Sequence, residues 1–359
     1  MEVYGPQQDA ATLKVMRSIL DEEKPDFVVI NGDIMQGDAL VLENATDYMD
    51  QVVTPMVERG LPWGSTYGNH DYQYNLTGRT ILETEQKYVN ARTKSMVKGD
   101  EAGESNYWLP VYAEDCQDCK KCVPELILWF FDSRGGVRFR ELDEDGKKIP
   151  FGSWVHESVV SWFTKTRDRL ERRYKKVVPS IGFVHMPMNA SQALQGTTWD
   201  PKHHPGMNQD IPIHGQAQNY CPDGTMGDCT YGGQDIPFMK AIASTRGMLG
   251  LFSAHDHGQT WCIPWDKLVE GMDIEGTGTN LCFGQHTGFG GYSDWIRGAR
   301  QIRVTQEGLR NSELDVWNRL EDGRVVGAVT LNSTYGSDVY PEVEQKEESF
   351  CDCDYPEEE

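Results

Sequence analysis

The stretch Glu23-Lys-Pro-Asp-Phe-Val-Val-Ile-Asn-Gly-Asp33 decides the fold class of this chain of 359 residues. Its apolar run at residues 27–30 has the length of a buried strand, and Asn-Gly-Asp after it has the composition of a turn. Residues 9–23 space their apolar side chains as a helix does, and Pro25 ends that helix. A helix that leads into a strand ending on a carboxylate is typical of an α/β domain with a ligand site at its strand ends.

Four later apolar runs end on polar side chains in the same way. The runs span residues 62–67, 126–131, 180–184 and 248–253. The residues that follow them are Gly68-Asn-His-Asp71, Asp132, His185 and Ala254-His-Asp-His257. Helical patterns alternate with these runs at residues 41–60, 76–96, 154–176 and 236–245. The alternation predicts one layered α/β domain.

The rest of the chain is predicted from composition. Short apolar runs indicate further strands near residues 280–284, 300–305 and 324–331. Three polar stretches with few apolar residues are expected to be surface loops, at residues 98–122, 141–152 and 187–235. The residues after Glu342 are rich in acidic side chains, which predicts a disordered tail.

The charge and hydropathy of the chain exclude two classes of partner. The chain has 56 acidic and 34 basic residues, a formal net charge of -22, so its surface repels phosphate backbones and nucleic acid is not an expected partner. Its longest apolar runs, such as residues 126–131, have strand length and are too short to cross a bilayer. No membrane span is expected.

The cysteines and glycosylation sequons bear on the compartment. Cys116, Cys119 and Cys122 form a C-x2-C-x2-C pattern with no fourth ligand nearby, which favours a disulfide-bonded loop over a zinc site. N-x-[ST] sequons occur at Asn44, Asn75, Asn189 and Asn332. Together these features favour a secreted or vacuolar glycoprotein. A signal peptide is not visible in this chain, because its first residues lack a basic start and an apolar core.

The oxygen and imidazole side chains at the strand ends are all groups that can bind metal ions. They are Asp33, Asn69, His185, His255 and His257. The last two are two residues apart, so in extended backbone both point to the same side. Taken singly, each has an ordinary explanation, such as a turn or a hydrogen-bonded histidine. Their shared position at strand ends favours a metal site, because carboxylate, amide and imidazole groups bind manganese, zinc and iron.

The order Gly-Asp, Gly-Asn-His-Asp, His and His-x-His resembles the motif order of the calcineurin-like metallophosphoesterase superfamily. Three stretches resemble its fungal and plant branch related to purple acid phosphatases. They are Glu23-Lys-Pro-Asp-Phe-Val-Val-Ile-Asn-Gly-Asp33, Gly182-Phe-Val-His-Met-Pro187, and Phe283-Gly-Gln-His-Thr-Gly-Phe-Gly-Gly-Tyr292 followed by Trp295-Ile-Arg-Gly-Ala-Arg300. The resemblance covers roughly residues 4–335. It implies a four-layer αββα sandwich with mixed sheets over residues 1–341, followed by the acidic tail at 342–359.

The resemblance also implies a site with two divalent ions, of manganese, zinc or iron. Asp33 would bridge the two ions. Asn69, His185 and His255 would complete the shell of one ion, and His257 would bind the other. Such a pair activates a metal-bound hydroxide and clamps the phosphate oxygens.

The catalytic residues that the resemblance implies lie beside the metal ligands. His70 would act as proton donor or transition-state stabiliser, oriented by Asp71. The implied activity is that of a metal-dependent phosphoric ester hydrolase, a phosphomonoesterase or protein phosphatase whose substrate is a small molecule or a phosphoprotein. A phosphodiesterase is the alternative within the family. The sequence does not indicate an oligomeric state.

The sequence departs from the family pattern in three places. The family opens with an Asp-x-His motif after its first strand, whereas no such motif precedes Asp33 and no histidine precedes His70. Ala254 replaces a usual glycine, and Gln36 stands where purple acid phosphatases have a metal-binding tyrosine. We therefore expect an N-terminally truncated domain without its first strand and with one metal shell incomplete. A catalytically impaired metal-binding module is the alternative from another functional class.

Four further histidines lie near the expected cleft. His203, His204 and His214 fall in the stretch 187–235, where a solvated loop is favoured over substrate contact. His286 is part of Gly-Gln-His-Thr-Gly, and its neighbouring glycines would allow close approach to substrate or metal.

Overall fold

A six-stranded mixed sheet forms the centre of the computed structural model, which describes residues 5–37, 39–40, 44–269, 271–346 and 348–349. In spatial order its strands are β11 (Cys262–Trp265), β12 (Thr279–Phe283), β10 (Met248–Ser253), β7 (Ser180–Val184), β4 (Leu126–Phe131) and β3 (Tyr107–Val111). The four inner strands are parallel, and the edge strands β3 and β11 pair antiparallel to them. The carboxyl ends of the inner strands therefore meet at one edge of the sheet.

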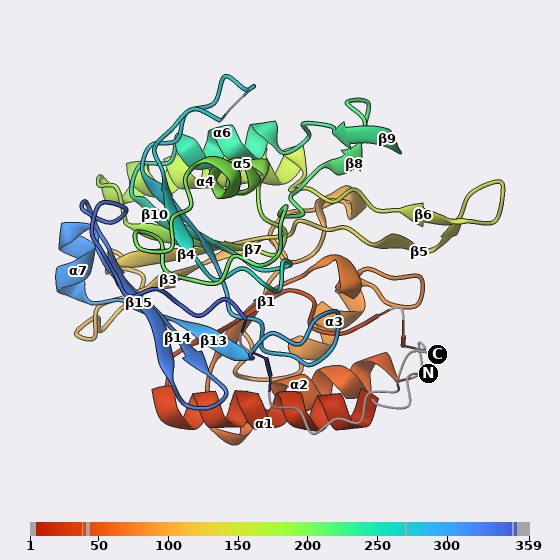
Figure 1. Cartoon of the computed structure of the whole chain (residues 1–359), viewed down its shortest axis with the longest axis horizontal. Helices are drawn as coiled ribbons and strands as arrows, with labels where there is room; N and C mark the ends of the chain where they lie inside the picture. Colours follow the sequence, from red (N-terminus) through yellow and green to blue (C-terminus); the bar gives the residue numbers. More distant parts are fainter. Residues whose placement is uncertain (1–4, 38, 41–43, 270, 347, 350–359) are drawn as a thin grey trace.

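Helices cover one face of this sheet (Figure 1). They are α4 (Glu157–Tyr174), α5 (Asn189–Thr197) and α6 (Ile236–Ala243). Their apolar side chains pack with Trp129, Phe131 and Leu251 of the sheet in one core cluster. Every residue of β4, β7 and β10 is buried, because parallel strands covered on both faces have no side that meets water.

A three-stranded antiparallel sheet packs on the opposite face. It consists of β13 (Gly298–Arg303), β14 (Leu314–Leu320) and β15 (Val325–Leu331), and α7 (Gln306–Asn311) connects the first two. Buried and half-buried residues alternate along β14, as in a strand with one covered face. Val316 from this strand shares a core cluster with Phe130 and Phe183 of the six-stranded sheet.

A parallel pair of short strands lies beside the three-stranded sheet. Strand β1 (Val28–Asn31) pairs with β2 (Trp63–Thr66). The helices α1 (Gly5–Glu23), α2 (Ala45–Glu58) and α3 (Gly78–Glu85) cover the pair (Figure 1). Val28 and Ile30 pack toward these helices, whereas Val29 packs toward the six-stranded sheet. All four residues of β1 are only half-buried, and in the described part of the chain β1 pairs with β2 alone.

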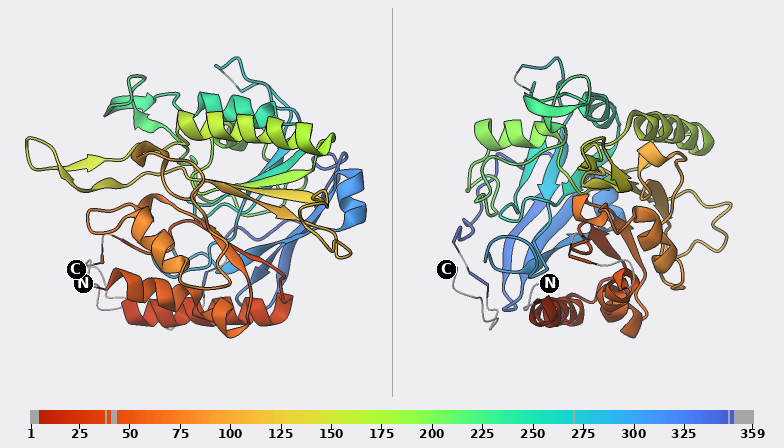
Figure 2. Two further views of the ribbon diagram at one scale, coloured as in Figure 1. Left: turned by 180° about the vertical axis from the view of Figure 1, so that it is seen from behind. Right: turned by 90° about the vertical axis from the view of Figure 1, so that its right-hand side faces the viewer.

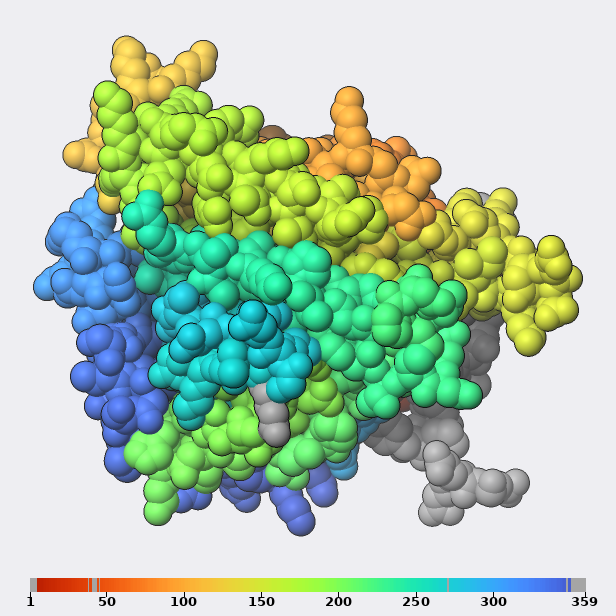
Figure 3. Space-filling model, turned by 90° about the horizontal axis from the view of Figure 1, so that it is seen from above, coloured from red at the N-terminus to blue at the C-terminus, as the bar shows by residue number. Residues whose placement is uncertain are grey.

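Two hairpins complete the strands. Strands β5 (Val137–Leu142) and β6 (Lys148–Pro150) form a hairpin that projects from one edge of the molecule (Figures 2 and 3). Strands β8 (Gln218–Tyr220) and β9 (Met226–Tyr231) form the second. Two 3-10 turns, at Asn69–Asp71 and Asp100–Ala102, lie between β2 and β3.

The predicted mixture of strands and helices is confirmed, and several predicted loops are wrong. The stretch 187–235 contains α5, β8 and β9 and buries Met207, Ile213 and Gln216. Strand β3 lies in the predicted loop 98–122, and the hairpin β5–β6 overlaps the predicted loop 141–152. In each case pairing with a distant or adjacent strand decides the structure, which local composition does not report.

The predicted acidic tail falls partly outside the described residues. Of residues 342–359 the structure describes 342–346 and 348–349. The Ser349 N–H donates to Asp294 O at 2.6 Å, and Gln345 Oε1 accepts from Asn208 N at 2.8 Å. These contacts hold the described part of this segment against the domain.

Three disulfides cross-link the chain. They join Cys116 to Cys122, Cys221 to Cys229, and Cys262 to Cys282. The first bond confirms the predicted disulfide-bonded loop and leaves Cys119 as an exposed free thiol. No helix among the described residues is both long enough and apolar enough to cross a membrane.

Candidate metal centre

The carboxyl ends of four strands converge on one group of polar side chains. Asp33 follows β1, Asn69 follows β2, His185 follows β7 and His255 follows β10. The side chain of Asn31 joins the two sheets at this point. Its Nδ2 donates to Phe252 O at 3.0 Å, and its Oδ1 accepts from Thr66 Oγ1 at 2.9 Å. The ends of β1, β2 and β10 are thereby held together.

Asp33, His185 and His255 form the tightest cluster of potential ligands. One ligand atom from each lies within 4.8 Å of the others. His185 Nε2 lies 2.9 Å from Asp33 Oδ2. Two ligand atoms bound to one ion at ~2.1 Å and at right angles to each other are ~3 Å apart, so this spacing fits a shared cation.

The tautomer of His185 suits a metal ligand. Its Nδ1 lies 2.8 Å from the backbone oxygen of Asn31, and because a carbonyl only accepts, Nδ1 carries a proton. In the neutral ring Nε2 then offers its lone pair. Nε2 is buried and faces Asp33 Oδ2 at 2.9 Å. A cation between these two atoms would bind both, and the Asn31 carbonyl would orient the ring as second partners of metal-bound histidines do.

The charges in the cluster also favour a cation. Burial acts to raise the pKa of Asp33, but His185 outweighs it and holds this pKa below the usual range. Burial and the neighbouring His185 lower the pKa of His255 to about 3. Burial acts to lower the pKa of His185, whereas Asp33 raises it, and the net shift is upward. Binding of a cation would displace a proton held between Asp33 and His185.

Two glycines permit the close approach of these groups. A Cβ on Gly32 would meet the His185 ring, and Gly32 has a φ of +87°. A Cβ on Gly68 would clash with Asp33 and would lie 2.6 Å from His185 Cδ2. Asp33 and His255 themselves have φ values of 47° and 70°. Left-handed backbone in such residues costs ~1–3 kcal/mol and is found mainly at functional sites.

Asn69 and His70 lie on the loop that contacts Asp33. The N–H of His70 donates to Asp33 Oδ1 at 2.8 Å. Asn69 Oδ1 is buried, and among the described residues it has no hydrogen-bond partner. The amide oxygen of Asn69 therefore has the unsatisfied lone pairs that a cation would use.

Asp71 contacts the backbone of two loops. This buried carboxylate accepts from Gly68 N at 2.8 Å, Ile34 N at 2.9 Å and Met35 N at 3.3 Å. It therefore joins the loop after β1 to the loop after β2. That Asp71 orients His70 stays a prediction.

His257 lies apart from the three-residue cluster. Its ring stacks on His286 at a centroid distance of 3.7 Å and on Tyr292 at 4.1 Å. His257 Nδ1 is 3.0 Å from Tyr292 O, so Nδ1 carries the proton and Nε2 is the potential ligand atom. Burial lowers the pKa of His257, which keeps the ring neutral. His286 is also buried, and its pKa lies well below the ordinary value for the same reason.

The histidines of the stretch 187–235 lie outside the three-residue cluster, and two of them have hydrogen-bond contacts elsewhere. His203 Nδ1 lies 2.8 Å from Asp338 O, and His204 Nδ1 accepts from Asp200 N at 3.3 Å. His204 is buried, so the predicted solvated position is wrong for this residue. The side chain of His214 remains 61% exposed.

Sequence reasoning missed three residues that shape the site. Asn31 orients His185 and joins the sheets, yet in the sequence it is only a turn residue after an apolar run. Tyr292 stacks on His257, and its position inside the Gly-rich motif was the available signal. Asp256 stands between the two motif histidines and is buried.

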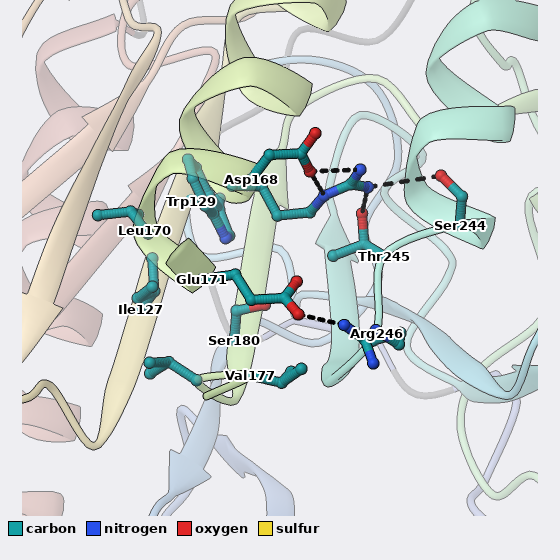
Figure 4. A pocket seen from close by; sticks show the side chains of 12 residues that line it. Ile127, Trp129, Asp168, Leu170, Glu171, Val177, Ser180, Ser244, Thr245 and Arg246 are labelled. Carbon is teal, nitrogen blue, oxygen red and sulfur yellow. Dashed lines mark hydrogen bonds and ion pairs between the residues drawn. The ribbon is translucent and has the colours of Figure 1, made fainter. Parts of the chain in front are cut away.

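A separate pocket lies at the opposite end of the sheet (Figure 4). Its lining includes Ile127 and Ser180, near the amino ends of β4 and β7, and its volume is about 230 Å³. The charged groups in it are paired. Arg167 bonds Asp168 at 2.9 Å and Arg246 bonds Glu171. Because these charges are already compensated, the pocket offers no free group for a ligand.

The chain is similar to known proteins over most of its length. The family model for calcineurin-like phosphoesterases matches residues 5–206. Probable inactive purple acid phosphatases 14 and 29 of Arabidopsis thaliana are 24% and 25% identical, each over 88% of this chain and over 73% and 75% of their own lengths. The phosphatase DCR2 of Saccharomyces cerevisiae is 24% identical over 87% of this chain and 48% of its own length.

A solved structure has a similar fold. The crystal structure of a dimetal phosphatase from Danio rerio matches with a TM-score of 0.52 and 12% sequence identity. The match covers 89% of this chain and 88% of that protein. At this level of identity the likeness concerns the fold alone.

Proposed function

The chain belongs to the calcineurin-like phosphoesterase family, and on this premise we propose that it is a metal-dependent phosphoric ester hydrolase that acts on phosphomonoesters. The observation that carries the proposal is the cluster of Asp33, His185 and His255, with one ligand atom of each within 4.8 Å of the others. We include in the proposal the four-layer αββα form of the fold. The order of helices, sheets and helices in Figure 1 supports it.

The residues present fit a cation. Asp33, Asn69, His185 and His255 would hold one divalent ion. Asn69 Oδ1, which is buried and has no hydrogen-bond partner among the described residues, supports this assignment. Oxygen and imidazole donors suit manganese, zinc or iron. When bound, such ions supply Lewis-acid polarisation of a phosphoryl oxygen and activation of water.

The chain's own residues would orient the substrate and handle protons. His70 is half-buried and lies beside the cluster, because its own N–H donates to Asp33. We assign His70 the role of proton donor to the leaving oxygen. Asp71 would keep the loop of His70 in place through its three backbone hydrogen bonds.

A catalytically impaired metal-binding module is the second candidate. The family resemblance assigns Asp33 and His257 to a second ion. Two relatives carry names that describe them as probable inactive phosphatases, whereas the yeast relative is named a phosphatase. A phosphodiesterase is the alternative within the hydrolase class.

A substrate panel tests the proposal. Aryl phosphomonoesters and diesters are offered to the protein with added manganese or zinc. We expect faster hydrolysis of the monoester, and loss of the rate in His185→Ala and in His70→Ala. The control His203→Ala should keep the rate, because His203 contacts Asp338 and not the cluster. Metal binding without turnover of either ester would support the impaired module instead.

The disulfides support a proposal about the compartment. Three disulfides among the described residues are typical of an oxidising environment. We propose that the protein is a secreted or vacuolar glycoprotein. Mass spectrometry of the native protein for glycans at Asn75, Asn189 and Asn332 tests this directly.

A further inference from the structure

A second cluster of potential ligands lies beside the metal centre and shares no residue with it. It consists of Asp210, His214 and Asp256, and one ligand atom from each lies within 4.8 Å of the others. Asp210 and His214 belong to the long segment after α5, and Asp256 belongs to the segment after β10.

The backbone fixes these two segments side by side. Asn208 and Gln259 form an antiparallel bridge. The N–H of Gln209 donates to Gly258 O at 3.0 Å, and the N–H of Thr260 donates to Met207 O at 3.0 Å. Asp210 comes directly after the paired residues of its segment, and Asp256 comes just before those of the other segment. The paired backbone therefore brings the two aspartates close together.

Asp256 carries the independent sign of a missing ligand. The residue is 4% exposed, and its Oδ2 is buried without a hydrogen-bond partner among the described residues. Its Oδ1 accepts from His214 N at 2.8 Å and lies 3.8 Å from His214 Nδ1. A buried carboxylate oxygen that lacks a partner is costly, so an unpaired oxygen on a member of this ligand cluster points to an ion.

The neighbouring contacts leave room for a cation. Asp210 accepts a hydrogen bond from Tyr292 through Oδ2. A carboxylate has two oxygens with about four lone-pair sites, so this bond does not use up its capacity. His214 is largely exposed, which allows its ring to turn toward the two carboxylates and allows water to complete the coordination.

We propose that Asp210, His214 and Asp256 form a further cation site, which takes a divalent ion of zinc or manganese type and fastens the segment after α5 to the segment after β10. One imidazole and two carboxylates are a donor set that these ions accept, with water in the remaining positions. The proposal does not depend on the hydrolase activity.

The site would stabilise His257 through Tyr292. Asp210 accepts from the Tyr292 hydroxyl, and Tyr292 O accepts from His257 Nδ1. The Tyr292 ring also stacks on the His257 ring. A cation that holds Asp210 therefore holds the partner that positions His257.

Equilibrium dialysis against zinc tests the proposal in the full-length chain. The variant His185→Ala removes a central ligand of the first cluster, and we expect it still to bind zinc. Adding Asp210→Asn or His214→Ala to this background should weaken the remaining binding by at least ~10-fold. Adding Asp228→Asn is the matched control, because Asp228 is an exposed aspartate in β9, outside both clusters.

Two further results decide the outcome. Zinc should raise the thermal midpoint of the His185→Ala protein, and this rise should be lost with Asp210→Asn or His214→Ala but kept with Asp228→Asn. Unchanged zinc affinity in both cluster variants would overturn the proposal. So would a His185→Ala protein that folds and binds no zinc. Neither result would contradict the proposed hydrolase, whose ligands are in the first cluster.

Discussion

The inner strands of the six-stranded sheet and strand β1 of the β1–β2 pair differ in how deeply they are buried. β4, β7 and β10 are buried along their whole length, whereas every residue of β1 is half-buried. The first sheet supplies His185 and His255, and the strand pair supplies Asp33 and Asn69. The two histidines thus follow strands of a fully packed core. Of the two potential oxygen ligands, Asn69 follows the buried strand β2 and Asp33 follows the half-buried strand β1.

The difference shows what the centre depends on. Asn31 ties β1 to β2 and to β10 of the six-stranded sheet, and Asp71 joins the loops that follow β1 and β2. The carbonyl of Asn31 in β1 orients the ring of His185, which follows β7. The position of this ring therefore depends on the strand pair as well as on the six-stranded sheet.

Core truncations in the two regions should differ most. Phe131→Ala removes a fully buried ring from the six-stranded sheet and should lower the free energy of unfolding by ~3–5 kcal/mol. Val29→Ala shortens a half-buried side chain of β1 and should cost about 1 kcal/mol. Urea unfolding measures both changes in the free energy of unfolding, provided that this free energy depends on urea concentration with the same slope in the two variants. Equal losses would show that β1 is as well supported as the central sheet.

Asp235, a buried acidic residue at the amino end of α6, should make the stability of the protein depend on pH. Burial raises the pKa of Asp235 to about 6 from its ordinary 3.8. The folded protein therefore holds this proton more strongly than the unfolded chain. The stabilisation is complete below pH ~4 and is lost as the pH rises through ~6, by roughly 2–3 kcal/mol.

The variant Asp235→Asn should remove this part of the pH dependence. The free energy of unfolding, measured by urea titration between pH 4 and 7, would show a smaller decline than in the parent protein. Asp228→Asn, at an exposed site, should leave the decline unchanged. A variant curve parallel to the parent curve would exclude Asp235 as its source.

Removing the tie between the two regions should have a moderate effect. Asn31→Ala deletes the bonds to Phe252 O and Thr66 Oγ1 and should lower the free energy of unfolding by ~1–2 kcal/mol. Metal affinity should also fall, since the ends of β1 and β10 are no longer held together. If stability falls and affinity does not, the tie supports the fold alone.

A single methyl group at the centre should weaken metal binding. Gly68→Ala would push on Asp33 and His185 and should weaken metal binding by ~10-fold, as other disturbances of ligand orientation do. Gly196→Ala, in helix α5, has open space around its Cβ and should change nothing. Equal affinities in calorimetric titrations of the two variants would contradict the tight approach at Gly68.

The sequence was most informative where strands are buried and continuous. The runs before Asp33, His185 and His255 are short, apolar and bounded by polar residues, so strand and ligand could be predicted together. Strand β3, by contrast, depends on its antiparallel pairing with β4 and was predicted as loop. A pairing partner far along the chain leaves no local pattern.

The sequence predicts which residues could bind metal, but it does not predict the contacts that hold these residues in place. Motif order named the five potential ligands, and the structure brings Asp33, His185 and His255 together. The backbone contacts of Asp71 and the stacking of Tyr292 on His257 depend on loop geometry, which residue spacing does not specify. The burial of Asp256 was hidden for the same reason, because a residue between two motif histidines carries no separate signal.

Anomalous diffraction from crystals of the protein grown with manganese would locate the proposed metal centre. We expect a manganese peak bounded by Asp33, Asn69, His185 and His255, at ~2.0–2.4 Å from their oxygen and nitrogen ligand atoms. Crystals of a protein that binds manganese in solution but shows no peak among these four side chains would contradict the proposed centre.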